Sequence, residues 1–530
     1  RKPMSAGQKL KLIQQLIQTV SLEEVTAAFR RNFQPDARLL LVIMPEKEGL
    51  VAPKEEELLA LAREVAGAEV APPEEKVMRE SLLEEEPAPG TITDREEEPE
   101  LGVLSVTLSN GVRAHLRHMD FKENQVFIKL TVGGGVIQET AQNRGVTGLA
   151  AEVFDQPASS TLSSTEVQDL LTGKNVSLGG GAVEDALQVS LTSSTQDVES
   201  AFQLAHMVLT DPRLERSAVD RWKEQMLQAI EKRRMDVGDQ AMEAMQELLS
   251  GGDARFQFPT EQQVQGLTGE QAQAWLDRLL REGPVEAAVV GDVDRERALE
   301  LTLKYFGSLP ERPFTDPSLE ALRGLGYREG PLVATVEVPT ITPRAVVLSG
   351  WRGADWTDVE DRRILQIVAE MLTSRLREEI REARGLTYSI WCIARPSRGY
   401  EGGGLFTVWF TADPDKALEA ADLARGLVEE FAEEGPTDEE LSAVRKQFKN
   451  SIETSQKEPT YWVSVLGELD YRGTVLSDVK EALEKYTSYT REEMLDVMSR
   501  YVVSKRRLQA VALPVPPEES EGGQETPSED

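Results

Sequence analysis

The chain has 530 residues, of which 40% are hydrophobic and 28% are charged, as is ordinary for a globular protein. Its length exceeds what one hydrophobic core usually supports, so two or more domains are expected. The formal net charge of −33 argues against a nucleic-acid partner, because phosphate binding depends on clustered lysine and arginine. The acidity is compatible with a cationic or unfolded peptide partner, although a solvated acidic surface or a salt-adapted source is the simpler explanation.

The first predicted element is a helix followed by a strand, SLEEVTAAFRRNFQPDARLLLVIMP (21–45), and this unit recurs without gaps at 268–292 and 490–514. Each copy opens on a helix N-cap residue, has a glutamate two residues later, keeps one arginine, and closes on an apolar strand. The shared positions are Ser21, Thr268 and Thr490, then Glu23, Glu270 and Glu492, then Arg31, Arg278 and Arg500. Three endings with two preceding bodies predict that residues 1–45 finish a domain whose start is absent.

The next stretch differs from the repeat: it begins with a helix-like KEEELLALAREVAG and continues as an acidic, proline-interrupted segment, which is typical of a linker. An Asn110-Gly111 hairpin opens the domain that follows, and ERPFTDPS (311–318) marks a second boundary. The predicted order is a domain end at 1–45, an acidic linker at 46–100, complete domains at 101–312 and 313–516, and a disordered tail at 517–530.

Two related domains are also indicated by the similarity of SAVDRWKEQMLQAIEKR (217–233) to SAVRKQFKNSIETSQKE (442–458). Each body mixes strands with long amphipathic helices rather than alternating them strictly. This pattern predicts a duplicated α+β fold, in which each domain is an antiparallel sheet with helices packed on one side.

In the first complete domain, QVFIKLTVGGG (125–135) alternates like a strand, and RGVTGLAAEVF (144–154) has helical periodicity after a glycine turn. Metal-dependent hydrolases often carry ligands on such a helix. Here Gly148, Ala151 and Glu152 occupy the positions where ligands would stand.

Metal-binding residues are scarce elsewhere as well. Cys392 is the only cysteine and is expected to be a buried core thiol, which excludes an internal disulfide. The histidines are His115, His118 and His206; the first two differ by three in a strand, so their side chains point to opposite faces. We therefore expect no zinc site within this chain.

The second complete domain contains SRLREEIREARGLTYSI (374–390), which predicts the end of a helix and the start of a strand. Apolar residues recur at helical spacing, and Gly385 is placed to end the helix as a left-handed cap. The apolar positions are Ile364, Val368, Leu372, Leu376 and Ile380.

With these parts in place, nearly all of the chain resembles the C-terminal half of a pitrilysin/insulinase-family zinc peptidase, the inverzincins with an H-x-x-E-H motif. The resemblance implies that 1–45 end the second domain of such a protein and that the two complete domains are its third and fourth. In the family an R-G-x-x-H-x-x-E-H helix carries the metal. Arg144 and Gly145 persist here, but Gly148, Ala151 and Glu152 replace the two histidines and the glutamate. The zinc is therefore expected in the missing N-terminal half, with no cofactor bound by this chain.

The resemblance also implies roles for Arg381 and Tyr388, which have the spacing of a family pair that crosses the closed chamber toward the zinc-bound substrate. A phenol hydroxyl can bond the developing oxyanion, and a guanidinium can orient a peptide carbonyl. Arg384 is the competing candidate for the functional arginine. Alternatively, both arginines only complement the negative helix end and Tyr388 only packs.

The functional hypothesis is half of a zinc-dependent endopeptidase, whose partners are an N-terminal peptidase half, in the same polypeptide or a partner subunit, and peptide substrates. The alternatives are a catalytically inactive structural or assembly subunit and a peptide-binding module of the same fold. No apolar run is long enough to cross a bilayer. A bacterial extracytoplasmic, periplasmic location is expected by analogy alone.

Overall fold

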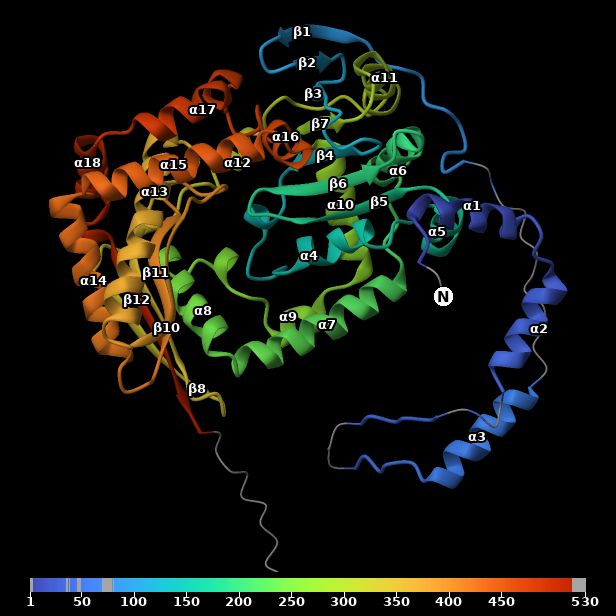
Figure 1. The fold of residues 1–530 in the computed structure, drawn as a ribbon, viewed down its shortest axis with the longest axis horizontal. Helices are drawn as coiled ribbons and strands as arrows, with labels where there is room; N and C mark the ends of the chain where they lie inside the picture. Colours follow the sequence, from blue (N-terminus) through green and yellow to red (C-terminus); the bar gives the residue numbers. More distant parts are fainter. Residues whose placement is uncertain are drawn as a thin grey trace, which may run out of the picture. The chain divides into compact units, whose positions relative to one another are not determined.

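The computed structural model describes residues 3–34, 37, 39–44, 49–68, 79 and 81–516, so the tail expected at 517–530 lies outside the described residues. The chain divides into two compact units, Arg1–Val77 and Met78–Asp530 (Figure 1). No helix in the described ranges has both the length and the apolar character that a membrane crossing requires.

The described part of the first unit is helical: α1 (Ala6–Ile17), α2 (Leu22–Asn32) and α3 (Glu55–Gly67). The helix expected from KEEELLALAREVAG is therefore present as α3. The strand expected at the end of 21–45 is not formed: residues 39–44 have no regular structure, and their side chains are exposed. A strand needs a hydrogen-bonded neighbour, and the described part of this unit offers none.

The second unit contains a seven-stranded sheet in the order β1-β2-β3-β7-β4-β6-β5. β3 and β7 run parallel, and every other neighbouring pair is antiparallel. Its strands are β1 (Ile92–Glu98), β2 (Val103–Leu108), β3 (Arg113–His118), β4 (Val126–Gly133), β5 (Val176–Ala182), β6 (Ala186–Ser193) and β7 (Val285–Gly291). The helices of this half are α4 (Val146–Ala151), α5 (Ser164–Leu171), α6 (Val198–Thr210), α7 (Arg216–Arg234), α8 (Val237–Ser250), α9 (Glu261–Gly266), α10 (Gly269–Glu282) and α11 (Arg295–Leu301).

The linker predicted at 46–100 is wrong for residues Ile92–Glu98. These residues form the edge strand β1, which pairs with β2 in the sheet. Its sequence, ITDREEE, is acidic and its central residues are exposed. Charged side chains on an edge strand discourage pairing with other molecules. The acidic composition that suggested a linker therefore belongs in part to a protected sheet edge.

A second sheet of five strands has the order β10-β11-β9-β12-β8, with β12 and β8 parallel and the remaining pairs antiparallel. This topology repeats that of β5-β6-β4-β7-β3 and confirms the duplicated α+β fold, with one parallel pair in each sheet. The strands are β8 (Leu332–Pro339), β9 (Ala345–Gly353), β10 (Thr387–Arg395), β11 (Gly404–Ala412) and β12 (Arg507–Val515). The helices are α12 (Pro317–Glu320), α13 (Val359–Leu376), α14 (Ala417–Glu434), α15 (Asp438–Ser455), α16 (Pro459–Leu466), α17 (Leu476–Ser488) and α18 (Arg491–Tyr501).

The repeated helices α2, α10 and α18 begin in the same way. Each N-cap hydroxyl accepts from the backbone N–H three residues later, and the side chain of that third residue accepts from the cap N–H. The residues that close these capping boxes are Glu24, Gln271 and Glu493, one position beyond the glutamates singled out in the sequence.

The two halves of the second unit exchange a helix. α8 follows α7 in the first half but packs on β8, β9 and β12 of the second sheet. α16 follows α15 in the second half but packs on β4 and β7 of the first sheet (Figure 1). The expected one-sided packing is therefore incomplete: each sheet has helices of its own half on one face and the helix of the other half on part of the second face.

Candidate functional site

The helix that follows the glycine turn, α4, is held by a buried carboxylate. Gly145 precedes it with φ 94°, a left-handed conformation that favours glycine. Glu139 accepts hydrogen bonds from the backbone N–H groups of Gly145 at 3.0 Å and Thr147 at 2.8 Å, and it pairs with Arg144. An anion at a helix N-terminus satisfies free N–H groups there, so Arg144 and Gly145 have a structural role.

The three positions that would carry metal ligands are packed instead. Gly148 faces the indole of Trp222, and Ala151 is buried. Glu152 lies 3.3 Å from Arg221 Nη2, and burial raises the pKa of this carboxyl against the opposing effect of that arginine. The α-helix also ends at Ala151 and continues as a 3-10 turn, so the regular helical face is interrupted. A zinc ion does not fit the residues present here.

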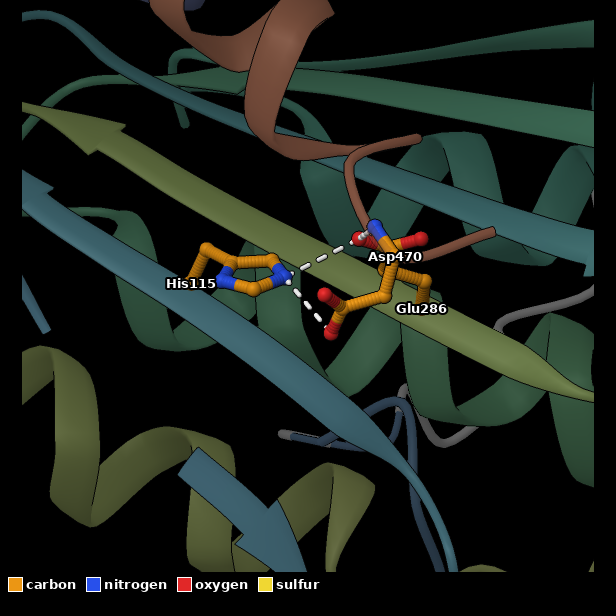
Figure 2. A group of neighbouring side chains, drawn as sticks. All are labelled: His115, Glu286 and Asp470. Atoms are coloured by element: carbon orange, nitrogen blue, oxygen red, sulfur yellow. Dashed lines mark hydrogen bonds and ion pairs between the residues drawn. The ribbon is translucent and has the colours of Figure 1, made fainter. Parts of the chain in front are cut away.

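Within the described ranges, one cluster does have metal-ligand chemistry: His115 on β3, Glu286 on β7 and Asp470, which follows α16 (Figure 2). Their ligand atoms all lie within 4.8 Å of one another. His115 Nε2 lies 3.0 Å from a Glu286 oxygen and 3.4 Å from an Asp470 oxygen.

The remaining bonds of this cluster identify it as an ion-pair group that joins the two halves. Glu286 also accepts from the backbone N–H groups of Asp470 at 2.9 Å and Tyr471 at 2.8 Å. The other ring nitrogen of His115 bonds the Ser105 hydroxyl at 2.8 Å. Burial alone would lower the pKa of His115, but hydrogen bonds to the two carboxylates raise that pKa to about 9. With both carboxylates bonded to the imidazole, the three residues form an ion-pair cluster between β3, β7 and the segment after α16.

The second predicted signature lies at the end of α13. The apolar stripe predicted there is buried, and Gly385 has φ 61°, as expected of a left-handed cap. Cys392 is a free, buried thiol. The sequence did not reveal that the helix ends in a π-helical segment, Arg377–Glu382, which contains Arg381.

Tyr388 lies in an irregularity of the edge strand β10. The register with β11 shifts between Thr387 and Ser389, so Tyr388 is the extra residue of a β-bulge. Its side chain is 58% exposed, whereas Thr387 is buried. A bulge redirects a side chain and commonly stands beside a functional site.

No hydrogen bond or ring contact links Tyr388 to Arg381 in the described part of the chain. The guanidinium of Arg344 lies 4.5 Å from the centre of the Tyr388 ring. In the described part of the chain, Arg381 and Arg384 are exposed and form no ion pair. Arg344 precedes β9, far from Tyr388 in sequence, which explains why spacing alone did not identify it.

Tyr388 is followed along β10 by exposed apolar side chains. Trp391 and Ile393 are exposed, and the Trp391 ring packs at a tilt against Trp409 of β11, with 5.1 Å between ring centres. Helix α8 packs on β8, β9 and β12 of the same sheet. The bulge and these side chains therefore border an uncovered part of the second sheet.

Comparison with known proteins shows which family and fold the chain is similar to. Residues 266–448 match the family model described as the peptidase M16 inactive domain. Over these residues the chain is similar to M16 inactive domains. A protein described as zinc protease PQQL-like from Arabidopsis thaliana is 22% identical over 407 residues, which cover 74% of this chain and 40% of the relative. These matches confirm the resemblance to zinc peptidases.

Two further proteins extend the comparison. The structure of the periplasmic protease PqqL from Escherichia coli aligns with a TM-score of 0.71 at 20% identity, over 97% of this chain and 56% of that chain. A non-peptidase homolog, YmxG of Helicobacter pylori, is 23% identical over 414 residues, which cover 73% of this chain and 92% of the relative. The chain spans about 40% of the length of the first curated relatives it matches.

Proposed function

We propose that this chain is the half of a zinc-dependent endopeptidase that does not hold zinc, and that it helps to enclose peptides and stabilises the transition state through Tyr388 and Arg381. The observation that carries this proposal is the bulge at Tyr388, which presents a tyrosine outward from an edge strand. A tyrosine that only packed would lie in the core with its strand neighbours Ile390 and Cys392, which are buried.

The chemistry proposed for Tyr388 is hydrogen-bond donation to the carbonyl oxygen of the scissile peptide as that oxygen becomes negative. The hydroxyl makes no hydrogen bond within the described part of the chain, so it is available as a donor. The guanidinium of Arg344 lies 4.5 Å from the centre of the ring and holds it at the sheet edge. Loss of one such donor typically raises the activation barrier by about 3 kcal/mol.

Arg381 is proposed to orient a peptide carbonyl or carboxylate through its planar guanidinium. It belongs to the π-helical segment that leads into β10, and its side chain is exposed and unpaired among the described residues. A free guanidinium loses no internal ion pair when it binds substrate. Arg384 has the same exposure, so the assignment between the two arginines remains part of the proposal.

The zinc ion and the general base would come from a second half that contains H-x-x-E-H. The partner proposed for this chain is therefore such a half, in the same polypeptide or as a separate subunit, with peptides as substrates. By analogy with the periplasmic PqqL protease, we place the protein outside the cytoplasm.

A second candidate is a structural or assembly subunit without peptidase activity. The packed zinc-helix position, where Gly148 and Trp222 leave no ligand set, fits this candidate as well as the first. The similarity to the non-peptidase homolog YmxG supports the same candidate.

The deciding experiment begins with the sequence encoded before Arg1 and in neighbouring genes, read for H-x-x-E-H. The half that contains the motif is then purified with this chain, and zinc-dependent cleavage of a quenched fluorescent peptide library is measured. Activity that requires both halves supports the peptidase. A stable complex with an intact zinc site but no cleavage would support the structural subunit.

A further inference from the structure

A cavity of about 410 Å³ lies between the two halves of the second unit, and Tyr388 is not among the residues that line it. One wall comes from α8 and the segment after it, and the opposite wall comes from the end of β10 and the loop before β11. Its volume falls within the usual range for small-ligand sites, roughly 300–1,000 Å³.

Tyr400 is one of the residues that line this cavity, and its buried hydroxyl lacks a partner. The residue is 2% exposed, and its hydroxyl has no hydrogen bond within the described part of the chain. The ring itself is fixed: it packs on Phe256 at 4.6 Å between centres and beneath the guanidinium of Arg255 at 5.0 Å. A buried, unpartnered hydroxyl is costly in free energy, so a polar group from outside the chain is its expected partner.

Cationic donors surround the same space. Arg233 Nε is also buried without a partner, while its Nη1 binds Asp239 at 2.8 Å. Arg395 is exposed and has no ion pair among the described residues. Together with the Tyr400 hydroxyl, these groups offer donors that no acceptor of the described chain occupies.

The carboxylate that lines the cavity, Glu184, is already engaged. One of its oxygens accepts from the backbone N–H groups of Arg398 at 2.9 Å and Gly399 at 2.6 Å, and from the Ser397 hydroxyl at 3.0 Å. Its negative charge is therefore partly compensated by the loop, and it does not reach the free donors through any hydrogen bond of the described chain.

The rest of the lining is apolar. Methionine, leucine and phenylalanine side chains form the wall nearest α8, and methionine adapts readily to differently shaped ligands. These residues are Met242, Met245, Leu249, Phe256 and Phe258, with Leu405 opposite. The cavity thus combines an apolar wall with hydrogen-bond donors, two of which are cationic.

We infer that this cavity is a binding subsite for a carboxylate carried beside an apolar side chain in a peptide. The carboxylate is either the C-terminus of the peptide or an aspartate or glutamate side chain. That the ligand is a peptide rests on the proposed function, whereas the preference for a carboxylate rests on Tyr400, Arg233 and Arg395. Bidentate and charge-assisted bonds to arginine suit this group.

Calorimetric titration of the full 530-residue chain tests the inference with three probes: N-acetyl-Ala-Ala-Leu with a free carboxylate, its C-terminal amide, and N-acetyl-Ala-Glu-Leu-amide. Tighter binding of the first than of its amide, by about tenfold, assigns the C-terminal carboxylate, since charged hydrogen bonds contribute about that factor. Tighter binding of the third probe than of the Ala-Ala-Leu amide assigns an acidic side chain. Equal binding of all three, or none, overturns the inference.

Matched variants place the binding in the cavity. Tyr400→Phe should weaken the preferred probe by about tenfold without lowering thermal stability, because the hydroxyl has no partner to lose. Arg395→Gln should weaken it similarly. Tyr327→Phe is the control, since that hydroxyl donates to the Glu401 carbonyl outside the cavity, and its affinity should be unchanged. Unchanged binding in both cavity variants, or equal loss in the control, overturns the assignment.

The binding experiment and the cleavage experiment can succeed or fail independently of one another. Selective carboxylate binding by this chain without cleavage by the combined halves would support the subsite and reject the peptidase. Cleavage by the combined halves with no carboxylate preference would do the reverse.

Discussion

Gly148 lies against the indole of Trp222, and a Cβ built on this glycine would stand 3.7 Å from the ring. A methyl group fits at that distance, whereas an imidazole extends further. We expect Gly148→Ala to leave stability unchanged or raise it by up to about 1 kcal/mol, because alanine favours the helix. Gly148→His should destabilise by about 1–3 kcal/mol through overpacking. Calorimetric unfolding of both variants measures the difference, and a stable Gly148→His variant would contradict it.

Rebuilding the metal motif should also fail to create a zinc site. The triple variant Gly148→His, Ala151→Glu and Glu152→His restores the ligand types, but α4 ends at Ala151 and the next residues form a 3-10 turn. The two imidazoles would then not share one helical face. Metal analysis after gel filtration should find less than one zinc per chain. Stoichiometric, tightly held zinc would show that ligand identity alone had been lacking.

Tyr388→Phe is expected to impair catalysis selectively in the combined two-half enzyme. The ring remains beside Arg344, so unfolding should occur at an unchanged temperature. The hydroxyl acts only as charge develops on the substrate oxygen, so kcat should fall by roughly two to three orders of magnitude with a smaller change in KM. Steady-state kinetics decides the matter: near-normal turnover would remove Tyr388 from the active site.

The arginine assignment needs its own comparison. Arg381→Lys keeps the charge but loses the planar fork, so both kcat and KM should deteriorate. Arg384→Lys is the matched control, because a cation near a helix end requires charge alone. If Arg384→Lys proves the more damaging in the same assay, the substrate-orienting role passes to Arg384.

The sequence predicted features that depend on neighbours along the chain. Helical spacing predicted the buried stripe of α13, and Gly385 has the expected left-handed conformation. The bulge at Tyr388 depends on register with β11, which periodicity does not specify. The amphipathic pattern of α8 shows that the helix has an apolar face but not which sheet that face covers. The helix exchange, and with it the position of Asp470 beside His115, therefore required the three-dimensional structure.

Residues 39–44 form an apolar run, LLLVIM, with exposed side chains at Leu39, Leu41 and Ile43. Apolar, uncharged segments of this length favour intermolecular strand pairing. We expect Leu41→Lys to reduce self-association of the chain, measured by light scattering across a concentration series. Leu22→Lys adds the same charge at an exposed position on α2 but leaves the run intact, so its association should match the wild type. Equal effects of the two variants would attribute the change to net charge.

The contact between His115 and its two carboxylates predicts how stability depends on pH. The pKa of His115 is raised to about 9, above the value of about 6.5 expected in the unfolded chain. Its contribution is therefore fully present below pH 6.5 and is lost as the pH rises through 9, by up to about 3 kcal/mol. Burial opposes ionisation of Asp470, but the bond to His115 keeps the pKa of that carboxyl lowered, so its contribution is lost on acidification instead. Stability should accordingly decline between pH 6.5 and 9.5.

Chemical denaturation at several pH values measures that decline. His115→Gln should be less stable near pH 6 and should have a flatter profile up to pH 9.5, because the titrating cation is gone. His206→Gln provides the control: burial lowers the pKa of His206, so its ionisation affects stability only toward acid pH. That variant should retain the wild-type decline. A wild-type profile that stays level from pH 6.5 to 9.5 would contradict the charged state of His115, and a decline that persists in His115→Gln would assign the pH dependence to another group.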